Sequence, residues 1–189
     1  MNEQDLQALQ ARDAEAFARL FDGYADKIYR LACGILEDEV EADCVVQDVF
    51  LRLFERLDQF DGRSQIGTWV YRIAYNASVD RLRKNRPTIA LSFEDDVEEP
   101  VMPAILADWR QAPETALSAA EIAAALDEAI AGLSPTLRAI FILREIEGFS
   151  TAETAAVSSL SQSAVKVRLH RARLALREDL SKRFVSHAL

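Results

Sequence analysis

Helical spacing of apolar residues extends along most of this 189-residue chain and is broken once, over residues 87–118. That segment contains four of the five prolines and the run Glu94-Asp95-Asp96-Val97-Glu98-Glu99. Proline ends a helix because it lacks the amide donor, and neighbouring like charges repel one another and extend the chain. We therefore expect an all-α protein of two small helical domains, residues 1–86 and 119–189, joined by a flexible acidic linker.

Three amphipathic helices are predicted before the linker, over residues 13–36, 41–57 and roughly 66–85. They would form an N-terminal helical bundle. A turn at residues 37–39 separates the first two helices, and a polar loop at residues 58–64 separates the second from the third. Pro87 ends the third helix.

The part after the linker predicts a helix-turn-helix. Ser150 and Glu153 have the spacing of a capping box that opens a short helix. A brief turn over residues 158–160 follows, and Ser161 is placed to cap a longer basic helix. A short helix, a tight turn and a longer basic helix are typical of this DNA-binding motif.

The net charge of −9 conceals two basic windows. Residues 63–86 contain six Lys or Arg side chains and a single acid, Asp80, while residues 161–177 contain five basic side chains and no acid. Local positive charge is what meets phosphate, so both windows predict DNA contacts. The acidic remainder would suppress non-specific DNA binding, which suits a protein that binds DNA only alongside a partner.

The basic C-terminal helix has two distinct faces. Val165, Leu169, Ala172 and Leu176 would pack inward, against the short helix that contains Ala155. The residues expected to reach DNA are Gln162, Ser163, Lys166, Val167, Arg168, His170, Arg171 and Arg173. Arg171 could bind guanine through two hydrogen bonds, while Lys166 and Arg168 suit phosphate. The alternative is a solvated basic face on a structural helix.

Aromatic and basic residues alternate between residues 60 and 86, a pattern that suits single-stranded or melted DNA. Asn76 could read a base edge there. Trp69 is better explained as a core residue, so the stacking hypothesis depends on the loop and on Tyr75. A third stretch, residues 43–50, sets polar Gln47 and Asp48 beside apolar Phe50, Leu51 and Phe54 and suits a partner helix. By periodicity alone, an ordinary amphipathic helix is the better explanation.

Several other functions are disfavoured. A nucleophile–base pair, a metal-ligand cluster and a phosphate-binding glycine loop are all missing from the sequence, so we expect no enzyme, cofactor or small-molecule substrate. Cys33 and Cys44 are best explained as small apolar core residues, with a disulfide or metal pair as the weaker alternative. No apolar run approaches membrane-spanning length, and the polar start is no signal peptide, so a cytoplasmic protein is expected.

The chain resembles the extracytoplasmic-function (ECF) type of bacterial sigma factor. Two segments resemble the family in the right order: VVQDVFLRLFERLDQFDGRSQIGTWVYRIAYNASVDRLRKNR, within residues 43–86, and LSPTLRAIFILREIEGFSTAETAAVSSLSQSAVKVRLHRARLALR, residues 133–177. The resemblance implies a promoter-specificity subunit with three partners: core RNA polymerase, promoter DNA, and an anti-sigma factor that is often membrane-bound. Residues 1–86 would bind polymerase and the proximal (minus-ten) element, and residues 119–189 the upstream (minus-thirty-five) element.

The resemblance also implies roles for individual residues. Polymerase would be bound by Asp43, Gln47, Asp48 and Phe50. A flipped base would be held by Asp61, Gly62, Arg63, Ser64 and Gln65 with Asn76, and the DNA backbone by Arg72, Arg81, Arg83 and Lys84. The upstream element would face Lys166, Val167, His170 and Arg171.

The chain departs from the family in a few positions. Cys44 stands where an acid is common, Ser159 stands where the turn usually has glycine, and Val167 and His170 are unusual on the recognition face. Two other functions compete with the sigma factor: a helix-turn-helix regulator that binds a duplex as a dimer, and an enzyme. The first needs a dimerisation helix, and no coiled-coil heptads are present.

Overall fold

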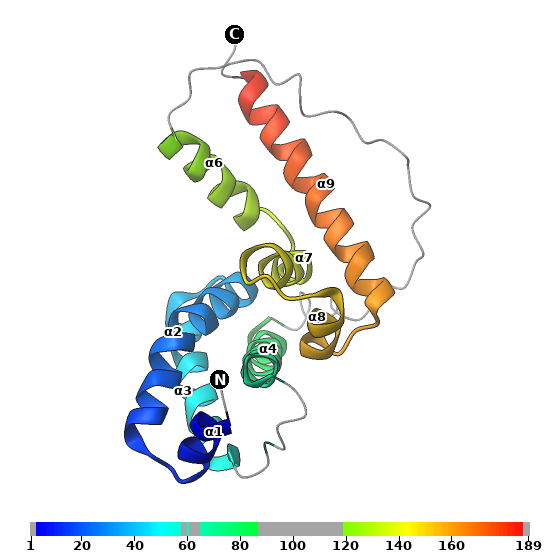
Figure 1. Ribbon diagram of the computed structural model, residues 1–189. Helices are drawn as coiled ribbons and strands as arrows, with labels where there is room; N and C mark the ends of the chain where they lie inside the picture. Colours follow the sequence, from blue (N-terminus) through cyan, green and yellow to red (C-terminus); the bar gives the residue numbers. More distant parts are fainter. Residues whose placement is uncertain (1–2, 58–59, 61–64, 87–118, 187–189) are drawn as a thin grey trace.

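The computed structural model describes residues 3–57, 60, 65–86 and 119–186, and in this part of the chain it contains helices and no strand (Figure 1). The helices are α1 (Glu3–Gln10), α2 (Ala14–Leu36), α3 (Glu39–Arg56), α4 (Ile66–Asn85), α6 (Ala119–Ala131), α7 (Pro135–Phe141), the π-helix η4 (Ile142–Ile146), α8 (Thr151–Ser158) and α9 (Gln162–Ser186). The all-α prediction is confirmed. Residues 87–118, for which we predicted an acidic linker, lie outside the described residues.

Capping side chains set the start of several helices. The carboxylate of Asp13 accepts a hydrogen bond from the backbone N–H of Ala16 at 2.8 Å and opens α2. Asp38 does the same for Glu41 at 3.0 Å, so α3 begins at Glu39, two residues earlier than predicted. α1 was not predicted, because an eight-residue helix contains too few turns to show a clear period.

Helices α2, α3 and α4 pack against one another, and in Figure 1 they lie side by side in the lower half of the molecule. α7 packs on α2, α8 packs on α4, and α9 runs away from this contact toward α6. The largest hydrophobic cluster reflects this arrangement. It joins residues of α2, α3 and α4, such as Ile35 and Val70, to Ile142, Leu143 and Val157 from beyond residue 118.

Two smaller clusters complete the C-terminal part. Val165 and Leu169 of α9 pack with Ile140 and Ala155, which confirms the predicted inward face of the basic helix. Ala172 and Leu176 continue that face against α6. No helix in the described ranges has both the length and the apolarity that a bilayer crossing requires.

Candidate nucleic-acid and partner interfaces

One exposed face of α4 holds polar and basic residues that the sequence assigned to DNA. Arg72, Asn76 and Arg83 are exposed, and their separations of four and seven residues put them on nearly the same side of a helix with 3.6 residues per turn. Lys84 and Gln65 are exposed near the two ends of α4. The other expected base-holding residues, Asp61, Gly62, Arg63 and Ser64, lie outside the described residues.

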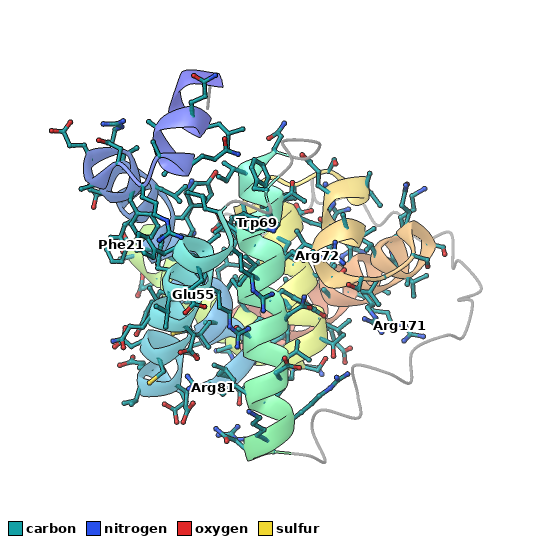
Figure 2. The ribbon with its side chains drawn as sticks, turned by 90° about the horizontal axis from the view of Figure 1, so that it is seen from below. Phe21, Glu55, Trp69, Arg72, Arg81 and Arg171 are labelled. Atoms are coloured by element: carbon teal, nitrogen blue, oxygen red, sulfur yellow. The ribbon has the colours of Figure 1, made fainter. Side chains whose placement is uncertain are left out.

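Arg81 is placed differently from the other basic residues of α4. Its guanidinium group pairs with two carboxylates of α3, at 3.0 Å from Glu41 and 3.6 Å from Asp48. Figure 2 views this side of the molecule, with Arg72 and Arg81 both labelled. The expected contact of Arg81 with the DNA backbone therefore competes with two carboxylates already beside it.

The aromatic side chains of α4 are largely covered. Tyr75 is 5% exposed, in a cluster that includes Val157 of α8, and this burial raises its pKa to about 12. The expected stacking role of Tyr75 is therefore wrong for this arrangement of the chain. Trp69 packs against the hydrophobic core with its ring centroid 5.2 Å from that of Phe60, as expected of a core residue.

The exposed side of α3 mixes acid, amide and apolar groups. Asp43 and Gln47 are exposed and Asp48 is partly exposed, so these three residues can meet a partner. Phe50 cannot, because its ring is 6% exposed and packs on Phe21 with centroids 4.6 Å apart. Phe50 therefore supports this surface from beneath, contrary to the expectation that it lies on it.

The two other apolar residues that the sequence placed on this mixed surface are exposed on the same helix. Leu51 is 59% and Phe54 39% exposed, and Phe54 packs edge-on against Phe17 of α2 with centroids 5.6 Å apart. Phe21, labelled in Figure 2, is also exposed. Gln47, Leu51 and Phe54 follow one another at helical spacing, so they lie on one side of α3.

Helices α8 and α9 form the predicted helix-turn-helix. The capping box is complete, since the Ser150 hydroxyl accepts from Glu153 N–H and the Glu153 carboxylate accepts from Ser150 N–H. Ser159 adopts a left-handed backbone with φ of 58°, so a residue with a β-carbon does occupy the position expected to need glycine. Ser161 caps α9 by accepting from Ala164 N–H at 3.1 Å.

The DNA-binding candidates of α9 separate by exposure. Gln162, Ser163 and Lys166 are exposed, and Val167, His170 and Arg171 are partly exposed. Two other arginines differ from these. Arg168 is 3% exposed and lies near enough to Tyr75 to affect its pKa, whereas Arg173 is exposed but pairs with Glu145 at 2.7 Å. In this arrangement Arg168 is not placed to contact phosphate, because its side chain is almost completely buried.

A buried arginine that the sequence did not single out joins the two parts of the chain. Arg138 of α7 is 5% exposed and donates to the carbonyls of Ile130 at 2.9 Å, in the last turn of α6, and of Leu133 at 2.6 Å, just after α6. It also donates to the Gly34 carbonyl at 3.2 Å and pairs with Glu37 at 2.8 Å, at the end of α2. Its charge thus satisfies carbonyl groups at the C-terminal ends of two helices.

Glu147 makes a second polar contact between the two parts. Its carboxylate accepts from the Tyr71 hydroxyl of α4 and pairs with Arg30 of α2. Burial, followed by the hydrogen bond to Glu147, raises the pKa of Tyr71, so the phenol stays protonated and remains a donor. Phe149 packs edge-on against Tyr71, with ring centroids 4.7 Å apart.

Both cysteines are free thiols and partly buried, which favours the packing explanation over a disulfide. Burial raises the pKa of Cys33, and the nearby carboxylates of Glu39 and Asp43 act in the same direction. In the described part of the chain, no group of three or more His, Cys, Asp or Glu residues is arranged to hold a metal ion.

Comparison with protein families gives two matches. Residues 20–88 match the family described as Sigma-70 region 2, and residues 123–176 match Sigma-70, region 4. The first range includes α3 and α4, and the second includes α8 and most of α9's basic window.

Curated proteins similar to the chain come from several bacteria. The ECF RNA polymerase sigma factor SigW of Bacillus subtilis is 35% identical over 170 residues, which are 89% of this chain and 90% of SigW. The RNA polymerase sigma-H factor of Pseudomonas aeruginosa is 33% identical and covers 95% of this chain and 93% of its own length.

Two solved structures have a similar fold. CnrH, solved in complex with the cytosolic domain of CnrY, has a TM-score of 0.61 and 26% identity, over 96% of this chain and 99% of CnrH. The sigma factor RpoE from Bartonella quintana, solved with the anti-sigma factor NepR, has a TM-score of 0.64 and 22% identity, over 89% of this chain and 98% of RpoE. The similarity to RpoE supports a shared fold and nothing further.

Proposed function

Because the chain belongs to the ECF family of RNA polymerase sigma factors, we propose that it binds core polymerase through residues 1–86 and reads two promoter elements. Residues 1–86 also bind and help to melt the proximal element, while residues 119–189 bind the upstream element. Residues 87–118 connect them. The observation that carries this proposal is the capped short helix α8, a tight turn at Ser159, and a long α9 with an exposed polar and basic face.

The upstream element is contacted by the outward face of α9. Gln162, Ser163 and Lys166 lie in its first two turns and are exposed, so they are placed where a recognition helix meets base edges and phosphate. Arg171 and His170 extend this face by one turn. Arg173 is held by Glu145, which makes it a weaker ligand for phosphate than Lys166.

The proximal element is contacted by the exposed face of α4. Arg72 and Arg83 bind the backbone of the melted strand, and Asn76 between them reads a base. The loop of residues 61–65 precedes α4 and completes this site. A carboxamide can donate and accept at once, which suits the edge of an unstacked base.

Polymerase binds the exposed side of α3. Asp43, Gln47 and Asp48 supply polar contacts, and Leu51 and Phe54 supply an apolar centre. Exposed apolar residues bordered by charge are characteristic of protein interfaces. Phe50 contributes indirectly, by fixing the aromatic rings on which this surface rests.

The activity is controlled by a protein inhibitor of the anti-sigma class, and the chain works in the cytoplasm. The support is family membership and the similarity to CnrH, whose solved partner is the cytosolic domain of CnrY. Attachment of that inhibitor to the membrane remains an expectation from the resemblance.

Run-off transcription tests the proposal most simply. Core polymerase is incubated with a genomic promoter library, with and without the chain, and the transcripts are sequenced. We expect discrete new start sites that require the chain. An unchanged set of transcripts together with tight duplex binding by the chain alone would favour a dimeric regulator and contradict the sigma assignment.

Two variants separate the proposed contacts. Asp48→Lys reverses a charge on the α3 surface and should abolish co-purification with core polymerase. Arg171→Ala should leave co-purification intact while lowering transcription from the new start sites. Equal loss of both activities in both variants would contradict the division of roles.

A further inference from the structure

The position of Arg81 on α4 separates it from the DNA-facing residues. Each residue of an α-helix advances by about 100°, so the nine-residue separation of Arg72 and Arg81 amounts to two and a half turns. Arg81 therefore projects from the side opposite Arg72. Asn76 and Arg83, by contrast, lie within roughly 40° of Arg72. This geometry directs Arg81 toward α3, against which α4 packs.

All three donor nitrogens of Arg81 are near oxygens of α3. Nε lies 3.0 Å from the Glu41 carboxylate, one terminal nitrogen donates to the Glu41 carbonyl at 3.4 Å, and the other lies 3.6 Å from the Asp48 carboxylate. Glu41 and Asp48 are seven residues apart, which is about two turns, so both lie on one side of α3. Arg81 spans this distance as a bridge between the two carboxylates.

The charges of this group do not suit a phosphate ligand. One guanidinium between two carboxylates has a net charge of −1, so a DNA phosphate approaching it meets repulsion from Glu41 and Asp48. Arg72, on the opposite side of α4, has no ion pair with any residue in the described ranges. The two arginines of one helix thus stand in different electrostatic surroundings.

The group is too exposed to matter much for folding. The side chains of Arg81, Glu41 and Asp48 are 28%, 33% and 47% exposed, and ion pairs at such sites contribute little to stability because water already solvates both partners. We therefore expect the ion pairs of Arg81 to matter where a bound partner covers them. Asp48 belongs to the surface that we assign to polymerase, and a docked partner would exclude water from it.

We propose that Arg81 is a positioning residue for polymerase binding, which holds Asp48 and the first turn of α3 in the orientation that polymerase meets, and that it does not bind promoter DNA. The inference rests on the proposed function, specifically on the place of Asp48 in the polymerase surface. It predicts that Arg81 and Asp48 act on polymerase affinity as one unit.

A double-mutant cycle on polymerase affinity tests the coupling. The full chain, labelled at its N-terminus, is titrated with core RNA polymerase as wild type, Arg81→Ala, Asp48→Asn and the double variant. We expect each single variant to weaken binding about fivefold and the double variant to be no weaker than Asp48→Asn alone. Arg72→Ala, the same substitution on the opposite face, should remain within about twofold of wild type.

Further variants separate positioning from a loss of structure. Arg81→Lys keeps the charge but cannot span both carboxylates, so it should recover part of the lost affinity. The thermal unfolding midpoint of Arg81→Ala should stay close to that of wild type, since the pair is exposed. A midpoint that falls together with the affinity would make Arg81 a structural residue and overturn the proposal.

The outcomes distinguish this inference from the proposed function. A wild-type chain that does not bind core polymerase would overturn both. A wild-type chain that binds, with Arg81→Ala at undiminished affinity or with fully additive effects in the double variant, would overturn the inference alone.

Discussion

Helices α4 and α9 both carry a basic window of the sequence, and they distribute their arginines in the same way. Each presents polar and basic residues on an exposed face, Arg72 and Asn76 on α4 and Lys166 on α9. Each also has an arginine that lies off that exposed face: Arg81 pairs with α3, and Arg168 of α9 is buried. A run of basic residues in a sequence therefore overstates the number of DNA contacts, because some of these residues face the rest of the protein when the run is helical.

The two helices differ in what their inward arginines meet. Arg81 meets carboxylates at the edge of α3, where water still reaches the pair. Arg168 is buried, and its charge acts on the buried Tyr75 of α4 by lowering the pKa of that phenol. Arg138 of α7 represents the extreme case, since it is buried and bonded to carbonyl groups from two helix ends.

The largest effect is expected where the arginine is most enclosed. Arg138→Met keeps the length of the side chain but leaves the Gly34 and Leu133 carbonyls without their donor and Glu37 without its partner. We expect the free energy of unfolding, measured by urea titration, to fall by about 2–4 kcal/mol. Arg72→Met should change it by less than about 0.5 kcal/mol. Equal effects of the two substitutions would remove the distinction between enclosed and exposed arginines.

The next effect distinguishes two arginines of α9. Arg171→Ala should weaken holoenzyme binding to an upstream-element duplex about tenfold, because a base-reading arginine is typically worth about 1–3 kcal/mol. Arg173→Ala should weaken this binding by less than about threefold, since Arg173 already forms an ion pair with Glu145. Electrophoretic mobility shift at fixed salt measures both. A larger loss for Arg173→Ala would reverse the assignment.

Two glycines of α2 test how closely the C-terminal part approaches. A β-carbon at Gly23 would meet nothing within 4 Å, whereas one at Gly34 would overlap the δ-methyl of Ile142. Gly23→Ala should raise the free energy of unfolding by up to about 1 kcal/mol. The free energy of unfolding of Gly34→Ala should be at least about 1 kcal/mol lower than that of Gly23→Ala, because overpacking offsets the same gain in helix propensity. Equal gains in thermal unfolding would show that this contact is loose.

The smallest effect is expected at the turn of the helix-turn-helix. Ser159 has a φ of 58°, a conformation that glycine adopts without steric cost. Ser159→Gly should therefore raise the free energy of unfolding by about 0.5–1 kcal/mol, measured by chemical denaturation. A loss of stability would mean that the serine hydroxyl makes a compensating contact.

Local signals in the sequence predicted the local structure well. The capping box of Ser150 and Glu153, the cap at Ser161 and the inward face of α9 were all confirmed, because each depends on residues a few positions apart. The same holds for α4, whose bounds agree with the prediction. The predicted division of function between residues 1–86 and 119–189 stays a proposal.

Long-range contacts were not predictable in the same way. Arg138 contacts Gly34 and Glu37 across more than 100 residues of sequence, and no periodicity relates positions so far apart. Tyr75 looked like a stacking residue because its neighbours are basic, yet it is buried where α8 packs on α4. Whether a basic or aromatic residue faces solvent depends on which helix packs beside it, and that information is absent from a short window.

The salt dependence of promoter binding tests most directly whether Arg72 contacts DNA and Arg81, on the opposite side of α4, does not. At saturating core polymerase, the affinity of the holoenzyme for a promoter duplex is measured over a series of salt concentrations for wild type, Arg72→Ala and Arg81→Ala. A lost phosphate contact reduces the slope of log affinity against log salt by about one unit. We expect that reduction for Arg72→Ala and an unchanged slope for Arg81→Ala. The same reduction in both variants would show that both arginines contact phosphate and would contradict the assignment of Arg81 to α3.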